Sequence, residues 1–279
     1  MKQKARIAAV LGTIQSSFTD FKYVRKIWKD TCNEERLLGV SLTGICDNPG
    51  LLGRPDLLEE LRSVVVETNA EWADRLGINQ SVASTCIKPS GTVSQLVDSS
   101  SGLHTRHSPF YLRTVRADKK DPLTAFLKDS GVYWEPEIGK EESTTVFYFP
   151  IKSPAGAVTR NDQTAIEALE VWSTLQEHWC EHKPSCTVSI REDEWLEAGD
   201  WVYKNFDTLS GVSFLPFDGG TYKQAPYQEI TEEEYNQWLV DHPAPVIDWD
   251  DLRFYEQEDH TTASQEFACT GNTCEIIAP

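Results

Sequence analysis

Hydrophobic and polar residues alternate along the chain with two different periods, and these periods predict helices in some segments and strands in others. Near the start of the chain, apolar side chains recur at i, i+3, i+4 and i+7, which predicts an amphipathic helix. We expect one buried face on this helix, made of Ile7, Val10, Leu11 and Ile14. The same spacing predicts two longer helices, over residues 55–76 and 162–180.

A period of two, in segments rich in β-branched and aromatic residues, predicts a series of short strands. They lie at residues 38–44, 81–87, 109–116, 145–151, 185–190 and 211–217. Thr231 and Glu234 form a capping box, which opens a further helix through Leu239. Because strands and helices alternate along most of the chain, we expect an α/β architecture with parallel strands.

The last part of the chain has a different pattern. The sequence His-Pro-Ala-Pro at residues 242–245 interrupts the alternation, and residues 246–268 are polar and acidic without a clear period. We therefore predict two parts. The first is an α/β portion over residues 1–245, and the second is a C-terminal extension over residues 246–279 that ends in a flexible tail.

The charge of the chain argues against one class of partner. Of its 279 residues, 26 are lysine or arginine and 44 are aspartate or glutamate, which leaves a net charge of −18. Such a chain repels a phosphate backbone at long range, so we expect no nucleic-acid polymer as a partner. A local pocket for a single nucleotide is compatible with this charge. No apolar run reaches the ~20 residues that a membrane helix needs, so we expect no membrane partner either.

Seven cysteines are scattered along the chain. An odd number at irregular spacing, in a chain of this size, is not typical of a secreted disulfide framework, and it favours a reducing cytoplasm. We expect most of these cysteines to be small buried apolar residues.

Two of the cysteines, Cys269 and Cys274, lie close to the end of the chain in the sequence FACTGNTCEIIAP. Gly271 and Asn272 allow the loop between them to turn sharply, so that this separation can close a disulfide. One interpretation is a redox-active dithiol on an arm that reaches other disulfides, since thiol–disulfide exchange requires access. The alternative is two incidental cysteines near a terminus.

A second candidate site is the turn that follows the predicted strand at 81–87. It has the sequence Lys-Pro-Ser-Gly-Thr and runs into a segment with helical spacing. Backbone N–H groups and the hydroxyls of Ser90 and Thr92 can bind phosphate oxygens without any net positive charge, and Gly91 lets a ligand approach the backbone closely. The alternative is an ordinary helix cap by Ser90.

Histidines supply two weaker candidates. His178, His182 and Cys186 are residue types that bind zinc, but their spacing matches no usual structural site, and we expect no metal there. His104 and His107 lie in the loop after the proposed phosphate turn, where they either line the pocket or pack at its rim.

Five stretches and one cysteine pair resemble segments of a known family, in the same order along the chain. They are residues 5–15 (ARIAAVLGTIQ), 38–44 (LGVSLTG), 87–98 (IKPSGTVSQLVD), 102–116, 214–217 with 224–228 (FLPF and QAPYQ), and the pair Cys269 and Cys274. They resemble the C-terminal part of the monomeric, adenosylcobalamin-dependent (class II) ribonucleoside-triphosphate reductases, and the resemblance covers nearly the whole chain.

The resemblance implies a fold, a reaction and partners. The fold would be the C-terminal portion of a ten-stranded α/β barrel. In the family, adenosylcobalamin generates a thiyl radical on a finger-loop cysteine, and ribonucleoside triphosphates are reduced to deoxyribonucleotides. By resemblance, Ser90, Gly91 and Thr92 would bind the substrate phosphates. Cys269 and Cys274 would be the pair that reduces the active-site disulfide and is itself reduced by thioredoxin.

The chain departs from the family pattern in one important respect. The finger motif, Asn-Pro-Cys with a nearby glutamate, is absent, and Cys32, Cys46 and Cys86 lie in no matching motif. We therefore expect the radical centre to lie on a separate N-terminal part of the reductase. Two alternatives stay open: an inactive truncated fragment, and a nucleotide-binding or thiol-exchange module that works alone.

Overall fold

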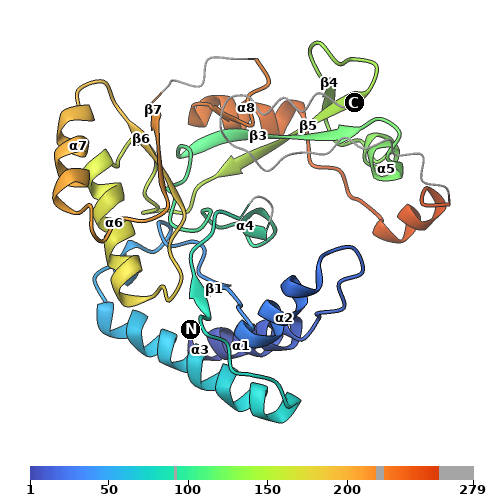
Figure 1. Ribbon diagram of the computed structural model, residues 1–279. Helices are drawn as coiled ribbons and strands as arrows, with labels where there is room; N and C mark the ends of the chain where they lie inside the picture. The colour runs from blue at the N-terminus through green and yellow to red at the C-terminus, as the bar shows by residue number, and fades with distance from the viewer. Residues whose placement is uncertain (91–92, 218–222, 258–279) are drawn as a thin grey trace. The chain divides into compact units, whose positions relative to one another are not determined.

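A computed structural model describes residues 1–90, 93–217 and 223–257 of the chain (Figure 1). The chain divides into two compact units. The first combines residues 1–106 with 154–217, and the second combines residues 107–153 with the segment that begins at residue 218. Both units contain helices and strands, so the predicted mixed α/β class is confirmed.

Parallel strands form the sheet structure of the first unit. They pair as β1 (Val40–Ser41) with β2 (Thr85–Cys86), and as β6 (Cys186–Ile190) with β7 (Val212–Pro216). A parallel bridge between Ile87 and Pro184 connects the two pairs. All four strands fall within the segments where alternation predicted them, and their parallel pairing is as expected.

The first unit also contains helices. They are α1 (Lys2–Ser16), α2 (Lys26–Glu35), η1 (Pro49–Leu51), α3 (Pro55–Leu76), α4 (Val93–Leu96), α6 (Ala165–His178) and α7 (Trp195–Lys204). Of these, α1 contacts β1 and α6 contacts β6. Helix α3 has proline in its first turn and ends at Gly77, whose φ of +65° suits glycine. A capping box of Thr164 and Glu167 opens α6.

Two tryptophans of the α6 region anchor the core of the first unit. The indole N–H of Trp172 donates to the Pro184 carbonyl at 3.0 Å, and that of Trp179 donates to the Cys86 carbonyl at 2.8 Å. Both side chains are fully buried. Their polar N–H groups are therefore satisfied by backbone oxygens beside the strands, which fixes α6 against the sheet.

The buried face of α1 differs from the predicted one. Ala5, Ala9 and Thr13 are buried, whereas Ile7 and Leu11 are 52% and 62% exposed. Helix α1 packs against α3, and small residues allow two helices to approach closely. Thr13 donates to the Ala9 carbonyl and accepts a 2.9 Å hydrogen bond from the Asn69 amide of α3, which satisfies its hydroxyl inside the contact.

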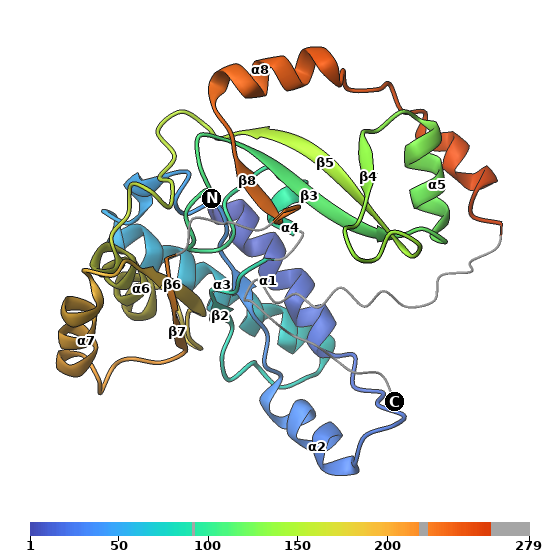
Figure 2. The same cartoon turned by 90° about the horizontal axis from the view of Figure 1, so that it is seen from above.

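The second unit is built on an antiparallel sheet of order β4–β5–β3–β8 (Figure 2). Its elements are β3 (Phe110–Asp118), α5 (Pro122–Asp129), β4 (Trp134–Pro136), β5 (Thr144–Lys152), β8 (Tyr227–Glu229), α8 (Glu232–Asp241) and η2 (Trp249–Phe254). Strands β3 and β5 were expected to be parallel, and that expectation is wrong. The connection between them holds the short helix α5 and the strand β4, which itself pairs antiparallel with β5.

Helix α8 packs on one face of this sheet, where Trp238 contacts a small apolar cluster of Leu112, Val146 and Tyr148. The capping box predicted at Thr231 and Glu234 is present. Of the predicted extension over residues 246–279, the structure describes η2 as far as residue 257, and the flexible tail stays a prediction. No helix among the described residues is long and apolar enough to cross a membrane.

Candidate functional site

The loops that follow β1 and β2 come together, because neighbouring parallel strands end at the same edge of a sheet. The loop after β1 covers residues 42–48, and the segment after β2 is described over residues 87–90 and 93–106 and includes the short helix α4. The backbone N–H of Lys88 donates to the Ser41 hydroxyl at 3.0 Å, which joins the two loops where they leave the sheet. This edge holds the proposed phosphate turn.

The backbone N–H and carbonyl of Ser90 are both hydrogen-bonded to other side chains of this segment. Its N–H donates to the Ser101 hydroxyl oxygen at 2.9 Å, and its carbonyl accepts hydrogen bonds from the hydroxyls of Ser101 and Ser94 at 3.2 and 3.1 Å. The hydroxyl of Ser90 itself is buried and makes no hydrogen bond among the described residues. Among the described residues, the Ser90 side chain therefore caps no helix N–H, and α4 has only four residues.

Two other serine hydroxyls in the same loop, those of Ser99 and Ser100, are likewise buried without a hydrogen-bond partner in the described part of the chain. The other predicted site residues, Gly91, Thr92, Cys269 and Cys274, lie outside the described residues. Their roles stay predictions.

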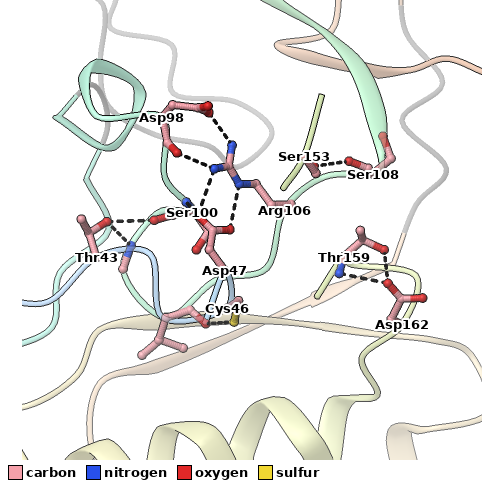
Figure 3. A network of polar contacts seen from close by, with 12 residues as sticks. Thr43, Cys46, Asp47, Asp98, Ser100, Arg106, Ser108, Ser153, Thr159 and Asp162 are labelled. Atoms are coloured by element: carbon pink, nitrogen blue, oxygen red, sulfur yellow. Dashed lines mark hydrogen bonds and ion pairs between the residues drawn. The ribbon is translucent and has the colours of Figure 1, made fainter. Parts of the chain in front are cut away.

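A set of hydrogen bonds joins the loop after β1 to residues 100–102 (Figure 3). The Thr43 hydroxyl donates to the Ser100 carbonyl at 2.8 Å and accepts from the Gly102 N–H at 3.1 Å. The N–H of Gly44 donates to the same Ser100 carbonyl at 2.8 Å. These bonds therefore fix the backbone on both sides of Ser101, at Ser100 and Gly102, to the loop after β1.

A buried arginine lies beside these hydrogen bonds. Nε and Nη2 of Arg106 donate to the two carboxylate oxygens of Asp47, each at 2.9 Å (Figure 3). Nη1 donates to Oδ1 of Asp98 at 3.0 Å, and Nη2 also donates to the Asp98 carbonyl at 2.6 Å. The Arg106 side chain is only 3% exposed. Burial raises the pKa of Asp47, but hydrogen bonds from Arg106 and Ser100 outweigh it and hold that pKa below its usual value.

Sequence reasoning missed Asp47 and Asp98. Both residues lie close to recognisable stretches: Asp47 follows the predicted strand at 38–44, and Asp98 ends the stretch at 87–98. An arginine beside two histidines in a loop gives no sign of burial. Only the fold shows that this arginine is enclosed and that it needs carboxylate partners.

His104 is a structural residue of this loop. Its Nδ1 lies 3.1 Å from the Ser101 carbonyl, and its Nε2 lies 3.1 Å from the Thr187 N–H. A neutral ring with its proton on Nδ1 satisfies both contacts. Burial lowers the pKa of His104, which favours the same neutral form. His107 belongs to the second unit, where its ring stacks on Tyr227 at 5.4 Å.

Of the three residues considered for zinc, the two histidines have other partners and the cysteine is buried. Nδ1 of His178 lies 2.8 Å from a Glu59 carboxylate oxygen, and Nε2 of His182 lies 2.9 Å from the Leu38 carbonyl. Cys186 is buried at the start of β6. Among the described residues, no group of three or more histidine, cysteine, aspartate or glutamate side chains could hold a metal ion.

Four further cysteines are buried free thiols, as predicted: Cys46, Cys86, Cys180 and Cys186. Burial raises the pKa of Cys46, Cys180 and Cys186 to about 12. Because the thiolate is the reactive form, these residues are poor partners for thiol–disulfide exchange.

Comparison with known proteins places this geometry in context. No protein-family model matches the chain. A probable adenosylcobalamin-dependent ribonucleoside-triphosphate reductase of Dictyostelium discoideum is 34% identical over 268 residues, which are 90% of this chain and 34% of the relative. The adenosylcobalamin-dependent ribonucleoside-triphosphate reductase of Lactobacillus acidophilus is 28% identical over 233 residues, which are 79% of this chain and 30% of the relative.

A crystal structure of a B12-dependent (class II) ribonucleotide reductase superposes with a TM-score of 0.75 at 23% identity, and the match covers 91% of this chain and 39% of that one. This likeness supports the predicted fold, a portion of the class II reductase fold. The chain spans about a third of the length of these sequence relatives. It is therefore a relative of the adenosylcobalamin-dependent ribonucleoside-triphosphate reductases and resembles their C-terminal part.

Proposed function

We propose that this chain is the C-terminal portion of a class II ribonucleotide reductase, an enzyme that converts ribonucleoside triphosphates to deoxyribonucleotides. In this proposal the chain supplies the loop that binds the substrate phosphates and the dithiol that thioredoxin reduces. A separate N-terminal part supplies the finger loop with its radical cysteine. The names of the sequence relatives and their partial coverage by this chain support the assignment.

The observation that carries the proposal is the hydroxyl of Ser90. A buried polar group without a partner costs about 1–3 kcal/mol, so such groups in a folded protein need an explanation. A phosphate oxygen of a bound nucleotide would accept this hydrogen bond. The hydroxyl also lies at the carboxyl end of a parallel strand, where α/β proteins place their ligands.

The four-residue helix α4 is too short to contribute much of a helix dipole. The proposed site therefore binds phosphate through hydroxyls and backbone N–H groups. Lys88 is the cation nearest to Ser90 in sequence. Gly91 and Thr92 complete the proposed loop.

The cofactor of the complete enzyme is adenosylcobalamin, which supplies the radical chemistry when it is bound. The corrin ring itself supplies ligands to the cobalt, and we assign none of the described residues to this cofactor. The four buried thiols also do not fit the redox role. Cys269 and Cys274 are proposed for it on their spacing and on the resemblance. A cytoplasmic location belongs to the same proposal and agrees with the free thiols of the described cysteines.

Nucleotide binding by the purified chain tests the loop. We expect a ribonucleoside triphosphate to change the tryptophan fluorescence or the amide spectrum of the chain. Ser90→Ala should weaken binding by about 1 kcal/mol, or roughly fivefold, because one hydrogen bond is lost. The matched control is Ser63→Ala, which removes an exposed hydroxyl on α3 that bonds only to the Glu59 carbonyl. Equal binding by both variants would contradict the assignment of Ser90.

A further inference from the structure

The geometry points to Arg106 and Asp47 as a positioning pair that fixes the backbone of Ser90 in the proposed substrate-phosphate loop. This inference rests on the proposed function, because it concerns the loop that carries Ser90. Neither residue is proposed to touch the substrate. Their effect passes through two hydrogen-bonded steps to Ser90.

The first step is the ion pair itself. Arg106 and Asp47 meet side by side, with two hydrogen bonds of 2.9 Å between the planar guanidinium and the carboxylate. This arrangement fixes the relative orientation of the two groups as well as their distance, which a lysine could not do. Because the arginine is almost fully enclosed, loss of the Asp47 carboxylate would remove its bidentate partner and leave Asp98 as its other carboxylate partner in the described part of the chain.

The backbone of Arg106 is also anchored, so its side chain starts from a fixed position. Its N–H donates to the Val158 carbonyl at 3.0 Å, and its carbonyl accepts from the Arg160 N–H at 2.9 Å. The N–H of Val158 in turn donates to the Cys46 carbonyl at 2.9 Å, next to Asp47. The pair therefore joins two segments that are already tied together by backbone hydrogen bonds.

The second step leads from Asp47 to Ser90. Oδ2 of Asp47 accepts the Ser100 N–H at 2.8 Å. Ser101 is the next residue, and its hydroxyl binds both the N–H and the carbonyl of Ser90 at 2.9 and 3.2 Å. The peptide unit between Ser100 and Ser101 thus separates the N–H that binds Asp47 from the residue whose hydroxyl binds Ser90.

The guanidinium also fixes the segment between these points. Asp98, which follows α4, has φ of +46°, a left-handed conformation that is uncommon for residues other than glycine. Arg106 binds both its carboxylate and its carbonyl. One buried side chain therefore holds the return from α4 to Ser100. A loop held in this way is preorganised, and a ligand does not have to order it on binding.

The test uses the full chain and four variants: three single substitutions and one double variant. Asp47→Asn disrupts the ion pair, and Ser101→Ala cuts the last link to Ser90 while it leaves the ion pair intact. The matched control is Glu71→Gln, which weakens the ion pairs of Glu71 with Arg6 of α1 and Arg75 of α3 in the same unit. Two quantities are measured: hydrogen exchange at the Ser90 amide, and affinity for a ribonucleoside triphosphate.

We expect Asp47→Asn and Ser101→Ala each to speed exchange at Ser90 and to weaken nucleotide binding about tenfold, a loss typical of outer residues that orient a site. Exchange at Val188 in β6 should change far less, which separates a local effect from general destabilisation. Glu71→Gln should leave both quantities within about twofold of the wild type, as is usual for a site that shares no partner with this loop.

The double variant with Asp47→Asn and Ser101→Ala decides whether the two act through one path. If they do, the double variant should have about the same nucleotide affinity as the single variant that binds less tightly. Additive losses would overturn the inference, as would unchanged Ser90 exchange in Asp47→Asn. If Asp47→Asn does not fold, Ser101→Ala alone must still show faster Ser90 exchange. A wild-type chain that binds no nucleotide would count against the proposed function, whereas the exchange measurements would still test the positioning pair.

Discussion

The N–H of Ser90 lies 2.9 Å from the hydroxyl oxygen of Ser101, and this hydroxyl also donates to the carbonyl of Ser90 at 3.2 Å. One side chain thus satisfies both backbone groups of the residue. The consequence is that the Ser90 hydroxyl is not needed to hold the turn. It is buried, and among the described residues it has no partner. A fixed backbone with an unused hydroxyl is what a small anion site requires.

Gly91→Val tests whether a ligand approaches the backbone of this turn. A branched side chain at this position should obstruct the approach of a phosphate, which glycine permits. In the enzyme reconstituted with its N-terminal part, we expect the Michaelis constant for the ribonucleoside triphosphate to rise at least about tenfold, equivalent to about 1.4 kcal/mol. Steady-state kinetics check this prediction. An unchanged Michaelis constant would show that the turn has a purely structural role.

His104 predicts a pH dependence of stability. Burial lowers its pKa in the folded chain, whereas an unfolded histidine titrates near pH ~6.5. Below that pH the unfolded state takes up a proton that the folded state does not, so the free energy of unfolding should fall as the pH falls from about 6.5 towards the folded pKa. His104→Gln should flatten this dependence.

Urea unfolding between pH 5 and 8 measures this effect. The matched control is His178→Gln, because His178 is bonded to an exposed glutamate on α3 and not to the loop. A pH dependence in His104→Gln as steep as that of the wild type would show that another group is responsible.

Cys269 and Cys274 are predicted to act together. In the reconstituted enzyme, Cys269→Ser or Cys274→Ser should abolish repeated turnover driven by thioredoxin, because exchange needs both sulfurs. A first turnover, with electrons stored on the active-site cysteines of the N-terminal part, should survive. A small dithiol that enters the active site should partly restore activity.

Product formed per enzyme distinguishes these outcomes: about one equivalent with thioredoxin for each variant, and many for the wild type. Cys186→Ser is a useful control, because its buried thiol has a raised pKa and is not expected to exchange. Full thioredoxin-driven turnover by either tail variant would show that the pair is incidental.

Local patterns predicted the elements well where a single face or a single cap determines them. The alternating segment at 185–190 became β6, and the capping box at Thr231 opened α8. The buried face of α1 was missed, because packing against α3 favours small residues over the larger apolar ones. The antiparallel pairing of β3 and β5 was missed because alternation reports a strand but not its direction.

The candidate site was predicted only in part. The turn at Ser90 was found from its position after a strand and from its hydroxyl-rich composition. The supports of the turn were not found, because Asp47 lies 59 residues before Arg106 and the hydrogen bonds of Asp47, Ser101 and Arg106 exist only in the folded chain. Charge and composition report no such long-range pairing.

The account as a whole predicts that this chain makes deoxyribonucleotides only together with the part of the reductase that bears the finger-loop cysteine. The most direct measurement is deoxynucleotide formation from a ribonucleoside triphosphate with adenosylcobalamin and a dithiol, by the chain alone and by the chain mixed with that N-terminal part. We predict no product from the chain alone and sustained product from the mixture. Turnover by the chain alone, or no product from a mixture of two folded parts, would contradict the account.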